Sequence, residues 1–201
     1  NFKDLMYALG KLETNRSEFE CAIGLEISGI LIKENGEAGE RVAGLVKESG
    51  YASYVNANEA FLFKIPDDWS LEDAATVPVA YYTVYYAFFI KSLVKSGQSI
   101  LIHSGAGGLG LAAIQVALSY GLEVFATVGD DEKKKFLLEK FSKLKAENIG
   151  NSRDSSFEEM IMKQTNYRGV DFVLNSLIEE KFQASLRCLA EGGILLEVGK
   201  L

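Results

Sequence analysis

Hydrophobic and polar positions alternate regularly from Ser99 to the end of the chain, where short apolar runs are separated by longer amphipathic stretches. Apolar runs of about 4–8 residues are typical of buried strands, and apolar positions three or four residues apart are typical of helices. The runs that predict strands are 99–102, 123–128, 148–150, 170–175 and 193–199. Because strands that alternate with helices form right-handed βαβ units, we expect an α/β fold with a doubly wound parallel sheet.

The first part of the chain, residues 1–71, has a different pattern of short strand-like segments punctuated by glycines. This pattern is typical of a small, irregular, mostly β domain. The segments that predict strands are 24–32, 41–46, 51–55 and 60–65. Asn35-Gly36 separates the first two segments and predicts the turn of a hairpin.

The residues between these two parts of the chain carry patterns that are typical of helices. Ser70, followed by an acidic turn, predicts a helix N-terminus. Pro78 must kink or interrupt that helix, because proline has no backbone N–H to donate. A second helix is expected over 81–93. The change of pattern predicts two domains, at residues 1–78 and 79–201.

The composition is that of an ordinary soluble protein, with 48% hydrophobic residues in a chain of 201. Lysine and arginine total 21 against 28 acidic residues, and the net charge of -7 argues against nucleic acid or an anionic membrane as the main partner. The longest uncharged stretch, residues 74–90, is shorter than the roughly 20 residues that a membrane-spanning helix needs. We interpret this stretch as a buried helix.

Metal and disulfide chemistry have little support in the sequence. Cys21 and Cys188 lie far apart, no CxxC motif occurs, and the chain has one histidine. These features disfavour a zinc site and a disulfide framework, and they favour a reducing, cytoplasmic location. The N-terminus has no signal-peptide pattern and no initiator methionine, so we expect a fragment of a longer protein.

A glycine-rich turn stands between the strand expected at 99–102 and the helix after it. Its residues, Gly105-Ala106-Gly107-Gly108-Leu109-Gly110, fit the Gly-x-Gly-x-x-Gly pattern of dinucleotide-binding Rossmann folds. Gly105 would make the tight turn, Gly107 would let the backbone approach a pyrophosphate, and Gly110 would let the helix pack closely. The helix N-terminus would offer its N–H groups to the phosphates. Glycine-rich turns also occur for steric reasons alone.

The residues after the second strand of this domain indicate the kind of dinucleotide. Folds that bind NADH usually carry an acidic residue there, which binds a ribose hydroxyl. Asp130 and Asp131 come one position late and are equally explained as a helix N-cap. The Thr127 hydroxyl and the Lys133 cation suit a 2'-phosphate instead, so we predict NADPH as the cofactor. The alternative for Lys133 is a solvated helix face.

Further polar residues follow the third and fourth strands, at the edge where open α/β sheets bind ligands. Ser152 or Arg153 could reach the same phosphate, and the alternative for Arg153 is a surface pair with Asp154. Asn175 and Ser176 are candidates for the nicotinamide half of the site. Ser176 is equally explained as a helix cap.

The last residue of the fifth strand, the residue after it and one residue before the glycine turn complete the candidates. Gly199 and Lys200 would lie near the nicotinamide ring, where the Lys200 ammonium could act in catalysis. A lysine in that position is most often only solvated. His103 is interpreted as a buried structural histidine rather than a catalytic base.

The sequence resembles the enoyl reductase domain of animal type I fatty acid synthase over essentially its whole length. The segments that carry the resemblance are 101–108, 127–129, 132–133, 151–158, 174–177, 179–181 and 184–190, together with 1–6, 24–29 and 77–79. The later segments are more specific to this family than the glycine pattern is.

The resemblance implies a zinc-free member of the medium-chain dehydrogenase/reductase superfamily, with a partial GroES-like substrate domain before a partial Rossmann domain. Gly24-Leu25-Glu26 stands where zinc-containing relatives carry Gly-His-Glu. The implied reaction transfers a hydride from NADPH to the β-carbon of a trans-2-enoyl thioester on an acyl carrier protein, in a synthase expected to be a homodimer. Lys200 matches the position of a candidate proton donor, and a candidate aspartate would follow later.

Other functions stay open at this point. The chain could come from a polyketide synthase, or from a stand-alone NADPH-dependent quinone or enone reductase of the same superfamily. A non-catalytic structural module that keeps the fold is an alternative of another class. The family's first strands and its sixth Rossmann strand are missing, so we do not expect activity from the fragment alone.

Overall fold

The structure, a computed structural model, describes residues 2–11, 23–47 and 49–199. It divides into two compact units, Asn1–Tyr82 and Thr83–Leu201, with separate hydrophobic cores. No helix in the described ranges is both long enough and apolar enough to cross a membrane.

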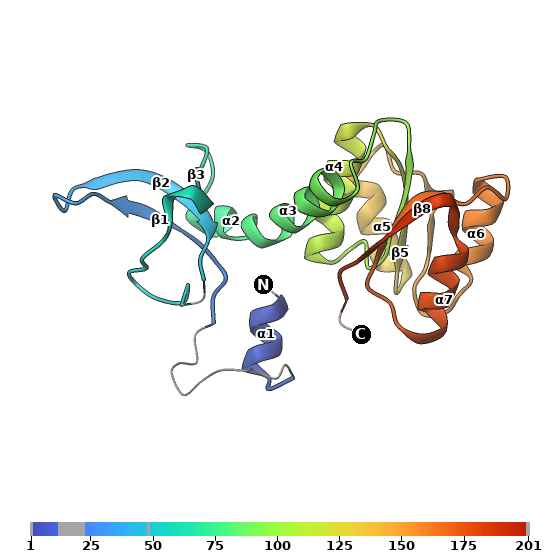
Figure 1. The fold of residues 1–201 in the computed structure, drawn as a ribbon, viewed down its shortest axis with the longest axis horizontal. Helices are drawn as coiled ribbons and strands as arrows, with labels where there is room; N and C mark the ends of the chain where they lie inside the picture. Colours follow the sequence, from blue (N-terminus) through green and yellow to red (C-terminus); the bar gives the residue numbers. More distant parts are fainter. Residues whose placement is uncertain (1, 12–22, 48, 200–201) are drawn as a thin grey trace. The chain divides into compact units, whose positions relative to one another are not determined.

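The first unit contains a three-stranded antiparallel sheet (Figure 1). Its strands are β1 (Glu26–Ile32), β2 (Ala38–Leu45) and β3 (Leu62–Lys64), in the order β1-β2-β3, with the short helix η1 (Glu59–Phe61) before β3. The predicted turn at Asn35-Gly36 is confirmed, because Lys33 and Glu37 pair across it. Ala43, Ile65 and Ala74 are the buried residues of the small core.

The N-terminal segment differs from the sequence prediction. Phe2–Ala8 forms helix α1, where the pattern predicts only strand-like segments. The buried Asp4 carboxylate accepts hydrogen bonds from the N–H groups of Gly24 at 3.0 Å and Leu25 at 3.3 Å. A contact between residues this far apart in sequence is not visible in a local pattern.

The strand predicted at residues 51–55 is wrong, since this segment forms bends. Tyr51 is 71% exposed and Tyr54 is 86% exposed. The alternation that suggested a strand therefore has no buried face, and burial of one face is what normally fixes a strand in a sheet.

Helices α2 (Leu71–Ala75) and α3 (Pro78–Tyr85) follow the sheet, and α3 continues as the π-helix η2 (Tyr86–Lys91). The predicted cap is confirmed, because the Ser70 hydroxyl accepts a hydrogen bond from the Asp73 N–H at 2.9 Å. Pro78 interrupts the helix as predicted and becomes the first residue of α3, where no N–H is needed. The second helix ends before Leu93, whose φ of 50° is left-handed.

The second unit contains the predicted parallel sheet. Its strands are β4 (Ser99–Ile102), β5 (Glu123–Val128), β6 (Ile149–Asn151), β7 (Val170–Asn175) and β8 (Leu189–Glu197), in the order β6-β5-β4-β7-β8. The helices between them are α4 (Gly108–Tyr120), α5 (Asp131–Lys140), η3 (Ala146–Asn148), α6 (Phe157–Gln164) and α7 (Glu179–Arg187). The doubly wound α/β fold is thereby confirmed.

The last strand begins earlier than predicted, at Leu189 rather than at residue 193. Its ladder with β7 shifts register between Val170, which pairs with Leu189, and Phe172, which pairs with Ile194. Gly192 and Gly193 lie inside this irregularity, and their presence hides the start of the strand from a pattern based on apolar residues.

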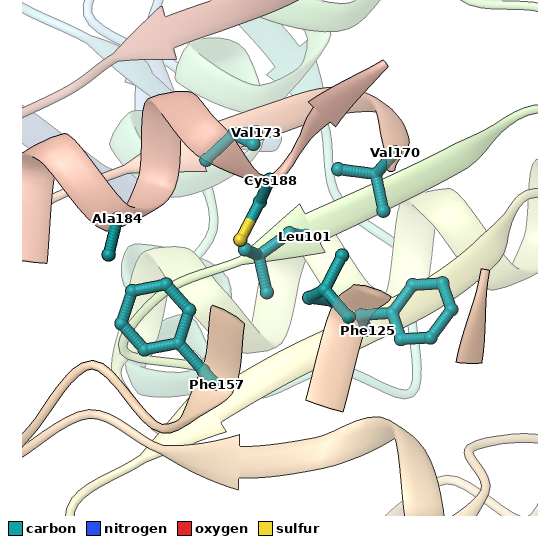
Figure 2. Close-up of a cluster of buried hydrophobic side chains, with 8 residues drawn as sticks. Leu101, Phe125, Phe157, Val170, Val173, Ala184 and Cys188 are labelled. Atoms are coloured by element: carbon teal, nitrogen blue, oxygen red, sulfur yellow. The ribbon is translucent and has the colours of Figure 1, made fainter. Parts of the chain in front are cut away.

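Alternate residues of the strands face the two layers of helices. Leu101, Phe125 and Val173 point to one face and pack with α6 and α7, through Phe157 and Cys188 among others (Figure 2). Figure 1 shows α6 and α7 together on one side of the sheet. Helices α4 and α5 contact β4 and β5, and the side chains of Ile114 in α4 and Leu137 in α5 lie next to Gly105. Burial raises the pKa of the Cys188 thiol to about 12, so this cysteine behaves as a small apolar residue, as predicted.

Candidate dinucleotide site

The glycine turn joins β4 to α4, in the strand–turn–helix context that the motif requires. The left-handed residue of the turn is Ser104, with a φ of 54°, so the tight turn predicted for Gly105 lies one residue earlier. A Cβ atom on Gly105 would lie 3.2 Å from side-chain atoms of Ala126 and Leu137. The absence of a side chain at Gly105 thus lets the turn pack closely against β5 and α5.

Gly110 is the position where a side chain fits least. A Cβ atom there would lie 2.3 Å from the Ser104 carbonyl oxygen and 2.8 Å from Gly105 Cα. The close approach predicted for Gly110 is therefore present, although the helix packs on the turn rather than on the strand itself.

Two glycines at the start of α4 are exposed to solvent. Gly107 and Gly108 are exposed, and a Cβ atom on Gly108 would meet no atom within 4 Å. Gly107 is the N-cap of a helix of 13 residues, with Ala106 and Leu109 partly exposed beside it. The first N–H groups of such a helix have no partner inside the helix, so this end favours an anion.

The order of the strands reverses between β4 and β7, which is where doubly wound sheets bind ligands. Ser104 after β4 and Ser176 after β7 meet there, with 3.0 Å between their hydroxyl oxygens. The alternative explanation of Ser176 as a helix cap is wrong, since the N-cap of α7 is Ile178. The hydroxyl of Ser176 pairs with the hydroxyl of Ser104 instead.

Asn175 is fully buried at the end of β7. Its amide nitrogen donates to Glu197 Oε2 at 2.7 Å and to the Leu177 carbonyl at 2.8 Å. Glu197 Oε1 in turn accepts a hydrogen bond from the Gly199 N–H at 2.6 Å. These bonds hold the ends of β7 and β8 together, which places Asn175 and Gly199 at one edge of the sheet.

Thr127 and His103 form a buried polar pair below this edge. Thr127 has no exposed surface, and its hydroxyl lies 2.9 Å from His103 Nδ1. His103 Nε2 lies 2.8 Å from the Ser185 hydroxyl of α7. Burial lowers the pKa of His103 to about 4, so its ring is neutral at neutral pH. The structural role predicted for His103 is confirmed, and the Thr127 hydroxyl faces His103 rather than the open edge.

Lys133 lies in the first turn of α5, where its ammonium is 2.7 Å from Asp130 Oδ2. Asp130 is the N-cap of α5, as one of the two alternatives for it expected, and its Oδ1 accepts the Lys133 N–H at 2.9 Å. Half of the Lys133 side chain is exposed. The cation is thus available to a ligand, but it already has a carboxylate partner.

Arg153 lies beside this pair, after β6. Its Nε donates to the Gly129 carbonyl at 3.4 Å, and a Cβ atom on Gly129 would lie 3.0 Å from that nitrogen. Asp154 accepts from Ser156 instead of pairing with Arg153. The Ser152 N–H donates to the Val128 carbonyl at 2.8 Å, so the ends of β5 and β6 are joined. The structure therefore brings Lys133 and Arg153 to the same corner.

Comparison with known proteins places these features in a family. A family model described as "Zinc-binding dehydrogenase" matches residues 108–201. "Highly reducing polyketide synthase anuA" of Penicillium roqueforti is 41% identical over the whole chain, and "Lovastatin diketide synthase lovF" of Aspergillus terreus is 39% identical. The chain spans only 9% and 8% of the length of these two relatives, respectively.

Solved structures show the same relationship. "CurK enoyl reductase" has a TM-score of 0.89 and 34% identity, over 100% of this chain and 63% of that one. "Putative enoyl reductase domain of polyketide synthase" has a TM-score of 0.57 and 36% identity, over 61% of this chain and 68% of that one. This chain belongs to the enoyl reductase domains of the medium-chain dehydrogenase/reductase superfamily. A mycobacterial structure complexed with NADPH has a TM-score of 0.79 and 28% identity, over 99% of this chain and 62% of that one.

The relatives correct one part of the sequence prediction for this enoyl reductase domain. The resemblance pointed to animal fatty acid synthase, whereas the two relatives above are fungal polyketide synthases. The polyketide synthase alternative therefore has the better support. The glycine turn is a pattern of dinucleotide-binding folds in general, so it could not separate the two kinds of synthase.

Two residues at the edge of this enoyl reductase domain were missed by sequence reasoning. The sequence pattern places Ser104 within the glycine-rich segment and Glu197 within the last strand, and it gives neither residue a role at this edge. A carboxylate at the end of an apolar strand was the available signal for Glu197. Lys200, the predicted catalytic residue, lies outside the described residues, as does Cys21.

Proposed function

We propose that this chain is part of the enoyl reductase domain of a highly reducing polyketide synthase. The domain would reduce the α,β double bond of an enoyl thioester carried by an acyl carrier protein, with NADPH as the cofactor. The observation that carries the proposal is the open glycine turn at the reversal of strand order, in a chain 41% identical to such a synthase. We further propose a cytoplasmic, homodimeric synthase.

The residues of the glycine turn fit the pyrophosphate of a dinucleotide. Gly107 and Gly108 are exposed and leave room above the start of α4, where side chains would otherwise stand. The helix N-terminus supplies N–H groups and a partial positive charge. The bound cofactor would supply the hydride, and these residues would hold and orient it.

The corner formed by Lys133 and Arg153 fits the 2'-phosphate that distinguishes NADPH from NADH. Both cations are exposed and follow neighbouring strands of the sheet. Charge-assisted hydrogen bonds to phosphate are stronger than neutral ones, and arginine can make two of them in parallel. In this proposal Ser152 contributes by joining the ends of β5 and β6, and Thr127 contributes through its hydrogen bond to His103.

The nicotinamide half would lie at the ends of β4, β7 and β8. The Ser104 and Ser176 hydroxyls meet there, and the Asn175 amide donates a hydrogen bond to Glu197. Gly199 precedes Lys200 at this edge. The Lys200 ammonium would stabilise negative charge that develops on the thioester oxygen, or give a proton to the α-carbon.

The test measures reduced-dinucleotide oxidation by the full-length protein with a crotonyl thioester and, separately, with a quinone. We expect thioester reduction, with NADPH bound more tightly than NADH. Lys133→Ala and Arg153→Ala should each narrow this preference by about tenfold, since a charged hydrogen bond is worth about 1.5 kcal/mol or more. Lys135→Ala is the matched control, because its ammonium faces Glu139 on the same helix.

Each possible result favours or contradicts one of the proposed functions. Equal affinities for NADPH and NADH would contradict the 2'-phosphate corner, and reduction of the quinone alone would favour a stand-alone type of reductase. Dinucleotide binding without any reduction would support a non-catalytic module. Unchanged thioester reduction by Lys200→Ala would remove Lys200 from the mechanism.

A further inference from the structure

The carboxylate of Asp130 occupies the corner where the 2'-phosphate would bind. Its Oδ1 caps α5 through the Lys133 N–H at 2.9 Å, and its Oδ2 lies 2.7 Å from the Lys133 ammonium. One side chain therefore performs two tasks. The cap needs only an oxygen atom, whereas the ion pair needs the negative charge.

Asp130 is charged at neutral pH. The hydrogen bonds from the Lys133 ammonium and N–H lower the pKa of its carboxyl, and the nearby charge of Arg153 contributes in the same direction. Asp130 is exposed, so no burial forces it to pair. Both cations of the corner thus act on this carboxylate when no phosphate is present.

A 2'-phosphate must share these two cations with Asp130. A phosphate at the Lys133 ammonium either displaces the carboxylate or lies beside it, and like charges at such a distance repel each other. A 2'-hydroxyl has no such conflict, because it can donate a hydrogen bond to the same carboxylate. Asp130 therefore opposes the ligand that Lys133 and Arg153 favour.

We infer that Asp130 is a specificity-determining residue, which lowers the preference of the domain for NADPH over NADH by holding the Lys133 cation. This inference rests on the proposed function, since it assumes that the dinucleotide binds at the glycine turn. The inference assigns opposite effects on cofactor preference to two neighbouring charges at the start of α5. Lys133 raises the preference for the 2'-phosphate, and Asp130 reduces it.

The experiment titrates NADPH and NADH into the full-length protein, with the fluorescence of the reduced dinucleotide as readout. Asp130→Asn removes the charge and keeps a capping oxygen, and Asp130→Ser does the same with a shorter side chain. Each should raise the ratio of the NADH to the NADPH dissociation constant by about two- to fivefold, the range expected for an exposed ion pair. Asp131→Asn is the matched control, because Lys133 pairs with Asp130 and not with this neighbour.

The outcomes separate this inference from the function on which it rests. A raised ratio in both Asp130 variants, absent in Asp131→Asn, supports it. An unchanged ratio in the Asp130 variants, or an equal rise in Asp131→Asn, overturns it while wild-type NADPH binding leaves the proposed function intact. A wild-type protein that binds no NADPH overturns both. Since the variants differ from wild type only at this corner, any other dinucleotide site contributes equally to every titration.

Discussion

At the scale of single residues, the glycines of the turn are required for different physical reasons. Gly110 is required by contact, because any side chain would overlap the Ser104 carbonyl. Gly108 has open space around it and is required, if at all, by a ligand. Stability and binding should therefore respond differently to the same substitution at these two positions.

Gly110→Ala should lower the free energy of unfolding by about 1–3 kcal/mol, the range for forcing extra atoms into a packed site. Gly108→Ala should leave it unchanged or raise it by up to about 1 kcal/mol, because alanine favours helix more than glycine does. Urea unfolding of the chain followed by circular dichroism measures both. Equal losses at the two positions would mean that the close contact at Gly110 is absent in solution.

At the scale of elements, four parts of the second unit meet at His103. Its ring bonds Thr127 of β5 and Ser185 of α7, while its backbone continues β4. Phe157 of α6 packs edge-on against the ring, with 4.9 Å between ring centroids. A neutral imidazole can donate with one nitrogen and accept with the other, which suits two hydroxyl partners.

This arrangement predicts a pH dependence of stability. The folded-state pKa of His103, about 4, lies below the ordinary value of 6.5. Between these values the unfolded chain binds a proton that the folded chain does not bind, so the stability present above about pH 6.5 is lost as the pH falls. From about pH 7 to about pH 5.5, the wild-type chain should lose about 1 kcal/mol more than His103→Gln does.

The measurement is urea unfolding of both proteins at the two pH values. His103 is the only histidine of the chain, so no other imidazole contributes to the difference. Carboxylates affect wild type and variant alike and cancel in the comparison. The same pH dependence in both proteins would show that His103 is not buried as a neutral ring.

At the scale of the whole molecule, the two units have different tasks in the proposed function. The second unit carries every described residue assigned to the cofactor, and the first unit carries the antiparallel sheet of the expected substrate domain. Ligand binding to one unit should therefore stabilise that unit directly.

NADPH at about 100 times its dissociation constant should add about 2.7 kcal/mol to the stability of the second unit. Amide hydrogen exchange in the buried strand β4 should slow by about a hundredfold as a result. Mass spectrometry of peptides covering residues 99–102 measures this. A double variant, Lys133→Ala with Arg153→Ala, is the control and should show much less slowing, whereas equal slowing would place the 2'-phosphate elsewhere.

The sequence by itself determined the α/β class and most strands of the second unit, because apolar runs and glycine turns are local signals. β4, β5 and β7 lie where the pattern predicts them. It also indicated which side chains follow the strands, since the carboxyl ends of parallel strands share one edge. Local patterns could not reveal α1, whose Asp4 accepts a hydrogen bond from the N–H of Gly24, 20 positions later in the sequence, nor the earlier start of β8.

Only the tertiary structure decided which of these side chains meet. It paired Lys133 with Asp130, brought Arg153 to the same corner and turned the Thr127 hydroxyl toward His103. Contacts of this kind depend on the order of the strands and on side-chain rotamers, and neither is encoded in the spacing of residues along a chain. The sequence indicated the candidate residues. The fold placed the Asp130 carboxylate next to the cations of Lys133 and Arg153.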